Sequence, residues 1–212
     1  MQAGKCFVAG SFFVLMVVGC AGEKPCARSA EDAHLTATAP AIPGFVLDAL
    51  HSDGAKSVKI YLAKDGTVRK SAVYVTKESL PNWVHALADE KLGQGEDEEY
   101  EVEQYGDSHQ VYEITRKVDG VSLELSVAVD KTLLYVEKKL AAKDLPEKVA
   151  AVLKEREGFT LDEAEAKTFP DGKMEYELEG KQGGFDVQLK VSADGEILSQ
   201  GRMFTAKVTV DR

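Results

Sequence analysis

The segment LELSVAVDK (residues 123–131) alternates apolar and polar residues and ends at a turn. Segments of the same kind occur at 58–66 (VKIYLAKDG) and 187–195 (VQLKVSADG), so the pattern recurs every 64 to 65 residues. A Leu-Pro pair follows the aspartate of each of the first two turns at the same distance, at 80–81 and 145–146. A fixed period indicates repeated supersecondary units, so we expect a fold built from copies of one unit.

The composition limits the class of protein. Of the 212 residues, 44% are hydrophobic and 29% are charged, which is typical of a globular domain with a packed core. The net charge of −10 argues against nucleic acid, whose binding requires Lys and Arg to neutralise phosphates. It also argues against docking on anionic lipid head groups. Cys6, Cys20 and Cys26 all precede residue 27, so we expect no disulfide and no thiolate metal site in the folded part.

The N-terminus has the features of a secretory signal. Lys5 precedes an apolar run over residues 7–18, which is too short to span a bilayer as a helix. The run ends in Val-Val-Gly-Cys (17–20), which resembles the lipobox of bacterial lipoproteins. That resemblance implies cleavage after residue 19 and attachment of lipid to Cys20. Ala21 is not the aspartate associated with inner-membrane retention, which favours sorting to the outer membrane.

Residues 1–19 are therefore the expected signal peptide, and residues 20–41 the expected flexible tether. The tether contains small and polar residues that cannot bury enough surface to offset their ordering entropy. An ordinary cleaved signal with an incidental cysteine is the alternative to lipidation. Cys26 is either a thiol without a role or the site of an intermolecular disulfide. We expect a lipid-anchored protein of the bacterial cell envelope that faces the periplasm.

Each complete unit should open with a helix. Ser79 and Asp144 are the expected N-caps, and a proline in the first turn follows each of them. Gly93 and Gly158 are expected to end the helices in the left-handed conformation. Between these limits, apolar residues recur at helical spacing. They are Leu80, Val84, Leu87 and Ala88 in one copy, and Leu145, Val149, Val152 and Leu153 in the other.

Four strands should follow each helix. Apolar and polar residues alternate over 99–104 and 163–168, and this period of two predicts antiparallel strands with one wet face. Asp-Gly pairs at 119–120, 171–172 and 194–195 predict tight turns between the strands.

The predicted fold class is α+β, with tandem units that each pack a helix on one face of a four-stranded antiparallel meander. Complete units are expected at 80–140 and 141–212. Residues 42–79 should form a partial unit of a short helix and a β-hairpin (58–75) that extends the sheet of the next unit. The other face of each sheet should remain in water or meet a partner.

Residues 80–200 resemble the PepSY-like family, small secreted domains grouped with beta-lactamase inhibitory protein because they share tandem helix-and-sheet repeats. The resemblance rests on the Leu-Pro helix start, the Tyr-Glu-hydrophobic strands at 112–114 and 176–178, and the closing Asp-Gly turn. Asp130-Lys131 departs from that ending, which puts only the turn type in doubt. The resemblance implies a binding or inhibitory module of the envelope, and it carries over no catalytic residue.

No catalytic constellation can be assembled from the sequence. The four histidines (34, 51, 85 and 109) are not near one another or a cysteine at metal-ligand spacing, and no HExxH, P-loop or nucleophile-elbow motif occurs. The acidic run 96–103 offers oxygen ligands that suit calcium, but it lacks an EF-hand loop and alternates along a strand. We interpret it as a solvated face that protects a sheet edge. We therefore predict no enzyme activity, no metal site and no cofactor.

Trp83 is the only tryptophan, and its counterpart in the next repeat is Lys148. A position that accepts lysine in one copy is expected to be exposed, so Trp83 is a candidate anchor for a partner. Phe45 occupies the equivalent place after Pro43 and is the second candidate. The alternative is that the two aromatic rings pack together or across the junction between units.

These features predict a non-enzymatic envelope lipoprotein whose repeats bind or inhibit a protein or peptide partner. A small-ligand or metal-ion carrier in the periplasm or envelope is the alternative. The oligomeric state and the partner's identity are not written in the repeat.

Overall fold

The computed structural model describes residues 44–204, apart from 53–54, 56, 64 and 107–108. Ten antiparallel strands form one sheet, in which each strand pairs with its neighbours in sequence. The strands are β1 (Ser57–Leu62), β2 (Val68–Tyr74), β3 (Glu96–Tyr105), β4 (Gln110–Val118), β5 (Val121–Ala128), β6 (Leu133–Lys139), β7 (Thr160–Thr168), β8 (Met174–Gln182), β9 (Phe185–Ser192) and β10 (Ile197–Met203).

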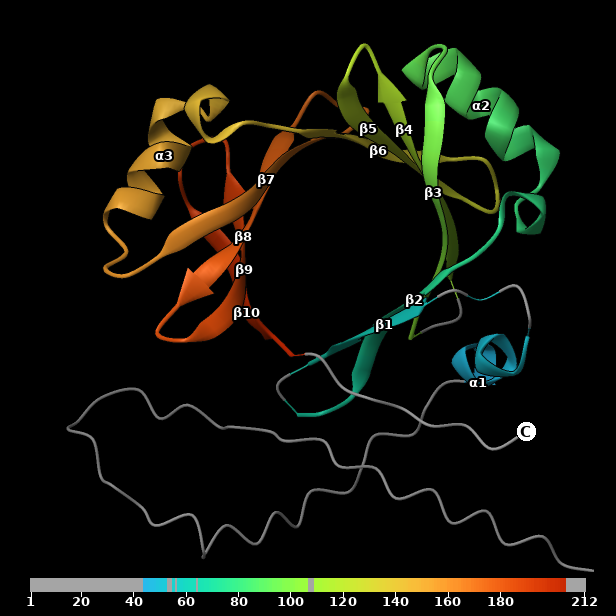
Figure 1. Cartoon of the computed structure of the whole chain (residues 1–212), viewed down its shortest axis with the longest axis horizontal. Helices are drawn as coiled ribbons and strands as arrows, with labels where there is room; N and C mark the ends of the chain where they lie inside the picture. Colours follow the sequence, from blue (N-terminus) through green and yellow to red (C-terminus); the bar gives the residue numbers. More distant parts are fainter. Residues whose placement is uncertain (1–43, 53–54, 56, 64, 107–108, 205–212) are drawn as a thin grey trace, which may run out of the picture.

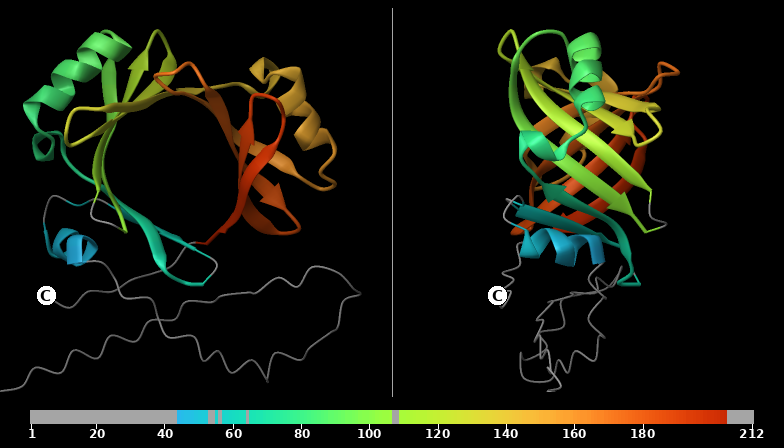
Figure 2. Two further views of the ribbon diagram at one scale, coloured as in Figure 1. Left: turned by 180° about the vertical axis from the view of Figure 1, so that it is seen from behind. Right: turned by 90° about the vertical axis from the view of Figure 1, so that its right-hand side faces the viewer.

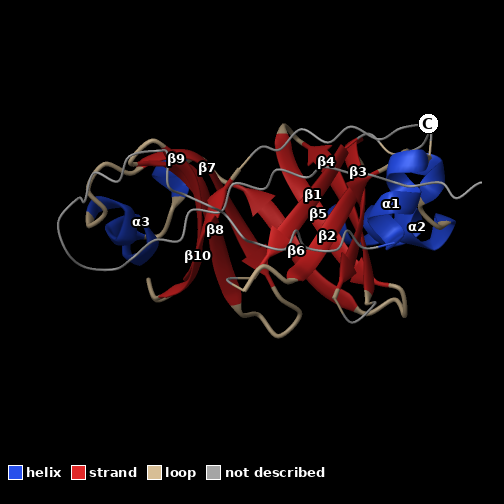
Figure 3. Ribbon diagram, turned by 90° about the horizontal axis from the view of Figure 1, so that it is seen from below, coloured by secondary structure: helices blue, strands red, loops and turns tan. Residues whose placement is uncertain are grey.

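Three short helices lie outside the curled sheet, as Figure 1 and Figure 2 show. They are α1 (Gly44–His51), α2 (Asn82–Leu92) and α3 (Glu147–Lys154), and two 3-10 turns, η1 (Lys77–Ser79) and η2 (Ala142–Asp144), precede α2 and α3. The view from below separates the helices from the strands by colour (Figure 3).

The predicted fold class is wrong. The described part of the chain is mostly β, with 52% of its residues in strands, and it has one continuous sheet in place of separate four-stranded repeats with helices packed on them. Strand β6 pairs with β7 from Val136–Thr168 to Lys139–Glu165, which joins the two complete units. A strand at the end of an isolated meander would leave its N–H and C=O groups unpaired, and this junction satisfies them. On the other side, β2 pairs with β3, so the first hairpin extends the same sheet.

The order of elements nonetheless occurs twice: η1, α2 and β3–β6 are followed by η2, α3 and β7–β10. The helix starts differ from the prediction. Ser79 and Asp144 end the 3-10 turns, and Pro81 and Pro146 are the N-cap residues. Gly93 is the C-cap of α2 with φ 86°, as expected for a residue without a side chain.

The turn between β4 and β5 follows the sequence prediction. Val118 pairs with Val121, which leaves Asp119 and Gly120 as a two-residue loop. Both have positive φ, 50° and 83°, as a type I′ turn requires.

The outer face of the sheet carries the apolar core. Val84, Ala88 and Leu92 of α2 cluster with Ile114 and Leu125. Full burial of one Val, Leu or Ile side chain contributes about 1.5–3 kcal/mol, so this contact fixes the helix to the sheet. The second unit has the same arrangement, with a cluster that includes Val149, Val152, Leu178 and Leu189.

The sheet curls until its two edge strands, β1 and β10, lie on the same side of the ring (Figures 1 and 2). Shifts of register accompany the curl. They fall at residues 61/62, 97/99, 126/127, 161/163 and 197/199. Such bulges bend a strand and increase its twist. The shifts after Asp97 and Leu161 are 64 residues apart, so the bend repeats together with the sequence.

Candidate functional site

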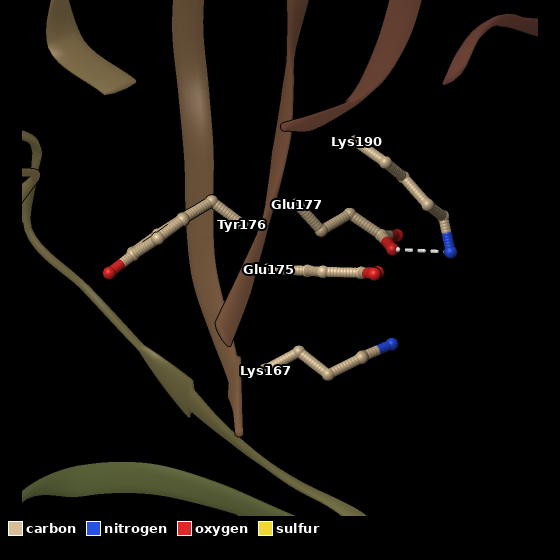
Figure 4. Close-up of a pocket in the computed structure, with 5 residues that line it drawn as sticks. All are labelled: Lys167, Glu175, Tyr176, Glu177 and Lys190. Atoms are coloured by element: carbon tan, nitrogen blue, oxygen red, sulfur yellow. Dashed lines mark ion pairs between the residues drawn. The ribbon is translucent and has the colours of Figure 1, made fainter. Parts of the chain in front are cut away.

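Polar side chains gather on the inner face of the curled sheet. Figure 4 shows the alternation along β8: Tyr176 points to one side, whereas Glu175 and Glu177 point to the other, as do Lys167 and Lys190. Tyr176 belongs to the core beneath α3, so the glutamates are on the inner face. The Nζ atom of Lys190 lies 3.0 Å from Oε2 of Glu177.

The sequence predicted that this polar face would be wet, and for its central strands that prediction is wrong. The exposed fraction is 9% for Glu101, 1% for Glu103 and 5% for Glu113. The acidic run is not at a sheet edge either, because β3 pairs with both β2 and β4. Curling the sheet turns the expected solvent face into an interior.

Three of these glutamates form a compact cluster. Glu101 and Glu113 are direct cross-strand partners, and Glu103 lies two residues further along the same face of β3. One carboxylate oxygen from each of the three lies within 4.8 Å of the others. The cluster therefore concentrates negative charge where little water can screen it.

Nearby side chains neutralise only part of this charge. Lys70 forms an ion pair with Glu103 through its ammonium group. The hydroxyl of Tyr105 donates to Oε2 of Glu103 at 3.0 Å, and the hydroxyl of Tyr135 donates to Oε1 of Glu113 at 2.6 Å. The tyrosines supply hydrogen bonds but no positive charge, so the direct ion pair compensates one carboxylate of three.

The pKa values report the same imbalance. Burial, together with the charges of Glu103 and Glu101, raises the pKa of Glu113 to about 8. Burial and the charge of Glu103 also raise the pKa of Glu101. Burial lowers the pKa of Lys70, but the charges of Glu103 and Glu113 outweigh burial and leave it raised. The raised pKa of Lys70 keeps its ammonium group charged, whereas the raised pKa values of Glu101 and Glu113 show that their ionised forms are disfavoured.

Two polar atoms on the inner face lack a hydrogen-bond partner within the described part of the chain. They are Oγ of Ser126, in a residue that is 0% exposed, and Oε1 of Glu137, in a residue that is 6% exposed. Ser126 lies directly across from Glu113 on one side and from Tyr135 on the other. A buried polar group without a partner costs about 1–3 kcal/mol, so the serine hydroxyl is available to a ligand at this place.

The second unit builds the same face with different residues. The strands of the two units align at an offset of 64 residues, which pairs Glu101 with Glu165, Glu103 with Lys167, Glu113 with Glu177 and Ser126 with Lys190. Two positions that hold a carboxylate and a hydroxyl in the first unit therefore hold ammonium groups in the second.

These lysines change the electrostatics of the second unit. Lys167 Nζ lies 3.0 Å from Oε2 of Glu137, and Lys190 pairs with Glu177. Burial raises the pKa of Glu177, but the charges of Lys190 and Lys167 outweigh burial and leave it lowered. The equivalent carboxylates Glu113 and Glu177 thus have pKa values displaced in opposite directions.

Lys70, Glu113 and Ser126 are site residues that the sequence pattern did not predict. A usable signal was present, because the repeat offset already aligned Ser126 with Lys190 and Glu103 with Lys167. The sequence pattern did not show that the sheet curls and that these residues lie together on its inner face.

The predicted partner-binding residues lie elsewhere. Trp83 is half-buried on α2, where its ring contacts Tyr112 edge-on with centroids 5.8 Å apart, and Lys131 Nζ lies 5.6 Å from its centroid. Phe45 is half-buried on α1, and both aromatic side chains pack against the cluster beneath α2. Both therefore lie on the outer side of the sheet, away from the glutamate cluster. Cys20, the predicted lipidation site, lies outside the described residues, as do the signal peptide and the tether.

Two histidines have structural contacts. Nδ1 of His51 lies 2.7 Å from the carbonyl oxygen of Leu47, and Nε2 of His85 lies 3.2 Å from that of Lys77.

A hollow of about 240 Å³ lies on the outer face where η2 and α3 meet the strands. Its lining residues are Lys138, Leu140, Asp144, Pro146, Ala166, Thr168, Met174 and Tyr176. Sites for organic ligands usually enclose about 300–1,000 Å³, so this hollow is smaller than the usual small-molecule site.

Comparison with known proteins finds no matching family model and no matching curated protein. Solved structures that resemble the chain include a BLIP-like protein from Bacteroides fragilis, at 21% identity and a TM-score of 0.45 over 62% of this chain and 92% of that one. They also include a DUF2874 family protein from Bacteroides ovatus, at 13% identity and a TM-score of 0.46 over 57% of this chain and 86% of that one. A structure described as a periplasmic protein from Bacteroides eggerthii has 13% identity and a TM-score of 0.47, over 57% and 88% of the two chains.

One of these neighbours is a BLIP-like protein, and PepSY-like domains are grouped with beta-lactamase inhibitory protein. Membership of this chain in the PepSY-like family remains a prediction, because no family model matches it. Because each TM-score is below 0.5, these similarities establish no function for this chain. Within the described ranges, no helix has both the length and the apolar character that crossing a membrane requires.

Proposed function

We propose that this chain is a non-enzymatic lipoprotein of the bacterial cell envelope that binds a protein or peptide partner. The observation that carries the proposal is the edge strand β10, in which every residue from Ile197 to Arg202 is exposed. The lipobox-like ending at Cys20 supports the location, with the protein anchored through that cysteine and facing the periplasm.

Strand β10 has the features of a docking edge. It pairs with β9 and is the last strand in the sheet, so its other side presents unpaired N–H and C=O groups. Ile197 and Leu198 are 43% and 44% exposed, and they lie at the register shift where β10 bulges against β9. Phe204, just beyond the strand, is 58% exposed. An extended peptide that added to this edge would gain backbone hydrogen bonds and contacts with these apolar side chains.

The other edge is less suited to this role. On β1, Nζ of Lys59 lies 4.9 Å from the ring centroid of Tyr74. The ring centroid of Tyr61, also on β1, lies 4.5 Å from Nζ of Lys70. The inward side chains of β1 are thus engaged with β2. Ile60, which is 40% exposed, provides a matched apolar position for a control.

The test is capture of the full-length, membrane-attached protein from its own envelope, followed by identification of cross-linked peptides. Leu198→Lys places a charge on the docking edge and should reduce recovery of the bound protein at least about tenfold, since a buried charge without a partner is strongly unfavourable. Ile60→Lys makes the same change on the opposite edge and should leave recovery unchanged. Equal recovery with both variants, or no partner cross-linked to β10, would reject the edge as the docking surface.

Trp83 and Phe45 remain proposed partner contacts of a second kind. Trp83→Ala and Phe45→Ala in the same capture test them, because an anchor residue should cost at least about 2 kcal/mol of binding free energy. Unchanged capture with a lowered melting temperature would assign both rings to packing alone.

A second candidate function, the binding of a metal ion, is favoured by the carboxylate oxygens of Glu101, Glu103 and Glu113 that converge within 4.8 Å.

A further inference from the structure

The inner face of the first complete unit holds more negative charge than its neighbours neutralise. Glu101, Glu103 and Glu113 are at most 9% exposed, and Lys70 pairs with Glu103. Moving an unpaired carboxylate out of water costs several kcal/mol or more, so such groups normally gain a counter-charge or a proton.

The second unit shows what kind of group completes this face. At the position equivalent to Ser126 it carries Lys190, whose ammonium lies 3.0 Å from the Glu177 carboxylate. At the position equivalent to Glu103 it carries Lys167. At these two positions the first unit therefore carries a carboxylate and a hydroxyl group, where its duplicate carries ammonium groups.

The serine hydroxyl is the independent sign of a ligand. Ser126 is 0% exposed, it faces Glu113 across the β4–β5 pairing, and its Oγ has no hydrogen-bond partner among the residues described. A buried hydroxyl next to a carboxylate would ordinarily donate to it. An unpartnered oxygen at this place fits a position between the two groups that a cation fills.

We infer that Glu101, Glu103, Glu113 and Ser126 form a binding site for a divalent cation, and that Ca²⁺ is the ion whose chemistry fits best. The ligands are all oxygen atoms, which hard cations prefer over softer metals. Calcium–oxygen distances are about 2.3–2.6 Å, so ligands on opposite sides of the ion are about 5 Å apart. The spread of the three carboxylate oxygens, within 4.8 Å, matches that span.

The surrounding residues are compatible with a bound ion. A carboxylate has about four acceptor positions, so Glu103 can keep Lys70 and the Tyr105 hydroxyl and still coordinate a cation. The Tyr135 hydroxyl holds Oε1 of Glu113, which orients that carboxylate as outer partners of metal ligands commonly do. The ion would take the role that Lys190 has in the second unit.

The experiment titrates CaCl₂ into the full-length protein, freed of metal by a chelator, and follows the heat of binding and the melting temperature. We expect one Ca²⁺ per chain and a rise in melting temperature, because a ligand that binds only the folded state stabilises it. Glu113→Gln should weaken binding at least tenfold. The matched control Glu177→Gln changes the equivalent residue of the second unit and should leave calcium affinity unchanged.

Ser126→Lys is a second test variant, because it introduces the ammonium group that the second unit has at the equivalent residue, Lys190. It should abolish calcium binding and remove the calcium-dependent rise in melting temperature, while circular dichroism shows the native sheet. Ser126→Ala removes only the hydroxyl ligand and should weaken binding by a smaller factor. No heat and no shift in the wild-type protein would overturn the inference, and so would equal affinities in Glu113→Gln and Glu177→Gln.

Discussion

The two complete units solve one packing problem in opposite ways. Where β3 meets β4, Asp97 pairs with Arg116 just before a register shift, and where β7 meets β8, Leu161 pairs with Gly180 just before the equivalent shift. The backbone is the same in both places. At the register shift, the first unit places the ion pair of Arg116 and Asp97, whereas the second unit places the apolar side chains of Leu161 and Phe159.

In the first unit, Arg116 is the centre of a polar network. Its Nε donates to Oδ1 of Asp97 at 2.6 Å, and its Nη1 donates to Oδ1 of Asp89 and to the carbonyl oxygen of Gly93, both at 2.7 Å. Gly95 makes room for this side chain, because a Cβ there would lie 2.9 Å from Cγ of Arg116 and 2.3 Å from the carbonyl oxygen of Lys117.

In the second unit, the glycine and the large side chain have exchanged places. Gly180 occupies the position of Arg116, and Phe159 occupies that of Gly95 at the 64-residue offset. A Cβ on Gly180 would lie 2.8 Å from Cζ of Phe159 and 2.1 Å from the carbonyl oxygen of Thr160. The bulge therefore accommodates either an arginine beside a glycine or a glycine beside a phenylalanine, because the two facing residues differ together between the units.

The largest effect should come from Arg116→Ala. Breaking a buried ion pair by removing one partner costs about 3–5 kcal/mol, because the other charge stays buried. Burial raises the pKa of Asp97, but hydrogen bonds from Arg116 and Tyr100 outweigh burial and leave it lowered. Without the guanidinium, that stabilisation of the carboxylate is lost. Urea denaturation at neutral pH measures the change in the free energy of unfolding.

The double variant Arg116→Met/Asp97→Leu is the control for that experiment. It gives the first unit the apolar character of the second, and replacing both members of a buried pair is often neutral. A double variant as unstable as Arg116→Ala would show that the network does more than satisfy its own charges.

The next effect in size should come from Gly180→Ala. The added methyl group meets a backbone oxygen that cannot move away without shifting β7, and overpacking of this kind costs about 1–3 kcal/mol. Gly201→Ala on β10 is the matched control, since a Cβ at that strand glycine has nothing within 4 Å. Thermal denaturation of both variants checks the difference, and equal melting temperatures would contradict the proposed close packing.

The smallest effect concerns the inner face of the second unit. Burial, with the charges of Glu137 and Glu163, raises the pKa of Glu165 from its ordinary 4.5 to about 8. A raised carboxyl pKa stabilises the fold below the unfolded-state value, and this stability is lost as the pH rises through 8. Glu165→Gln removes the titration, so at pH 9 the variant should be more stable than the wild type. Because Glu165 is only partly buried, solvent screens the effect to on the order of 1 kcal/mol.

The measurement for Glu165→Gln is urea denaturation at pH 5, 7 and 9. The loss of stability between pH 5 and pH 9 should be smaller in the variant than in the wild type. Glu90→Gln, which changes a glutamate whose side chain is 65% exposed, should leave the pH dependence as it is. Parallel curves for the wild type and Glu165→Gln would show that Glu165 is not under electrostatic strain.

Several elements could be predicted from particular residues. Val84 and Ala88 of the helical stripe are buried, the loop Asp119-Gly120 has the expected turn geometry, and the hairpin at 58–75 extends the sheet. The signals behind these predictions are local, because side-chain period and turn chemistry act over a few residues. The predicted N-caps failed because a 3-10 turn before Pro81 and Pro146 satisfies the backbone in another way.

The sequence by itself determined the duplication, the outer apolar face and which polar residues share the opposite face. Only the tertiary structure decided that the units fuse through β6 and β7 and that the curl buries the glutamates. The joining contacts are backbone hydrogen bonds, which leave no side-chain signature in the pattern. Alternation assigns Glu113 and Ser126 to a face, but the curvature of the whole sheet sets how much water reaches that face, and so whether its charges need partners.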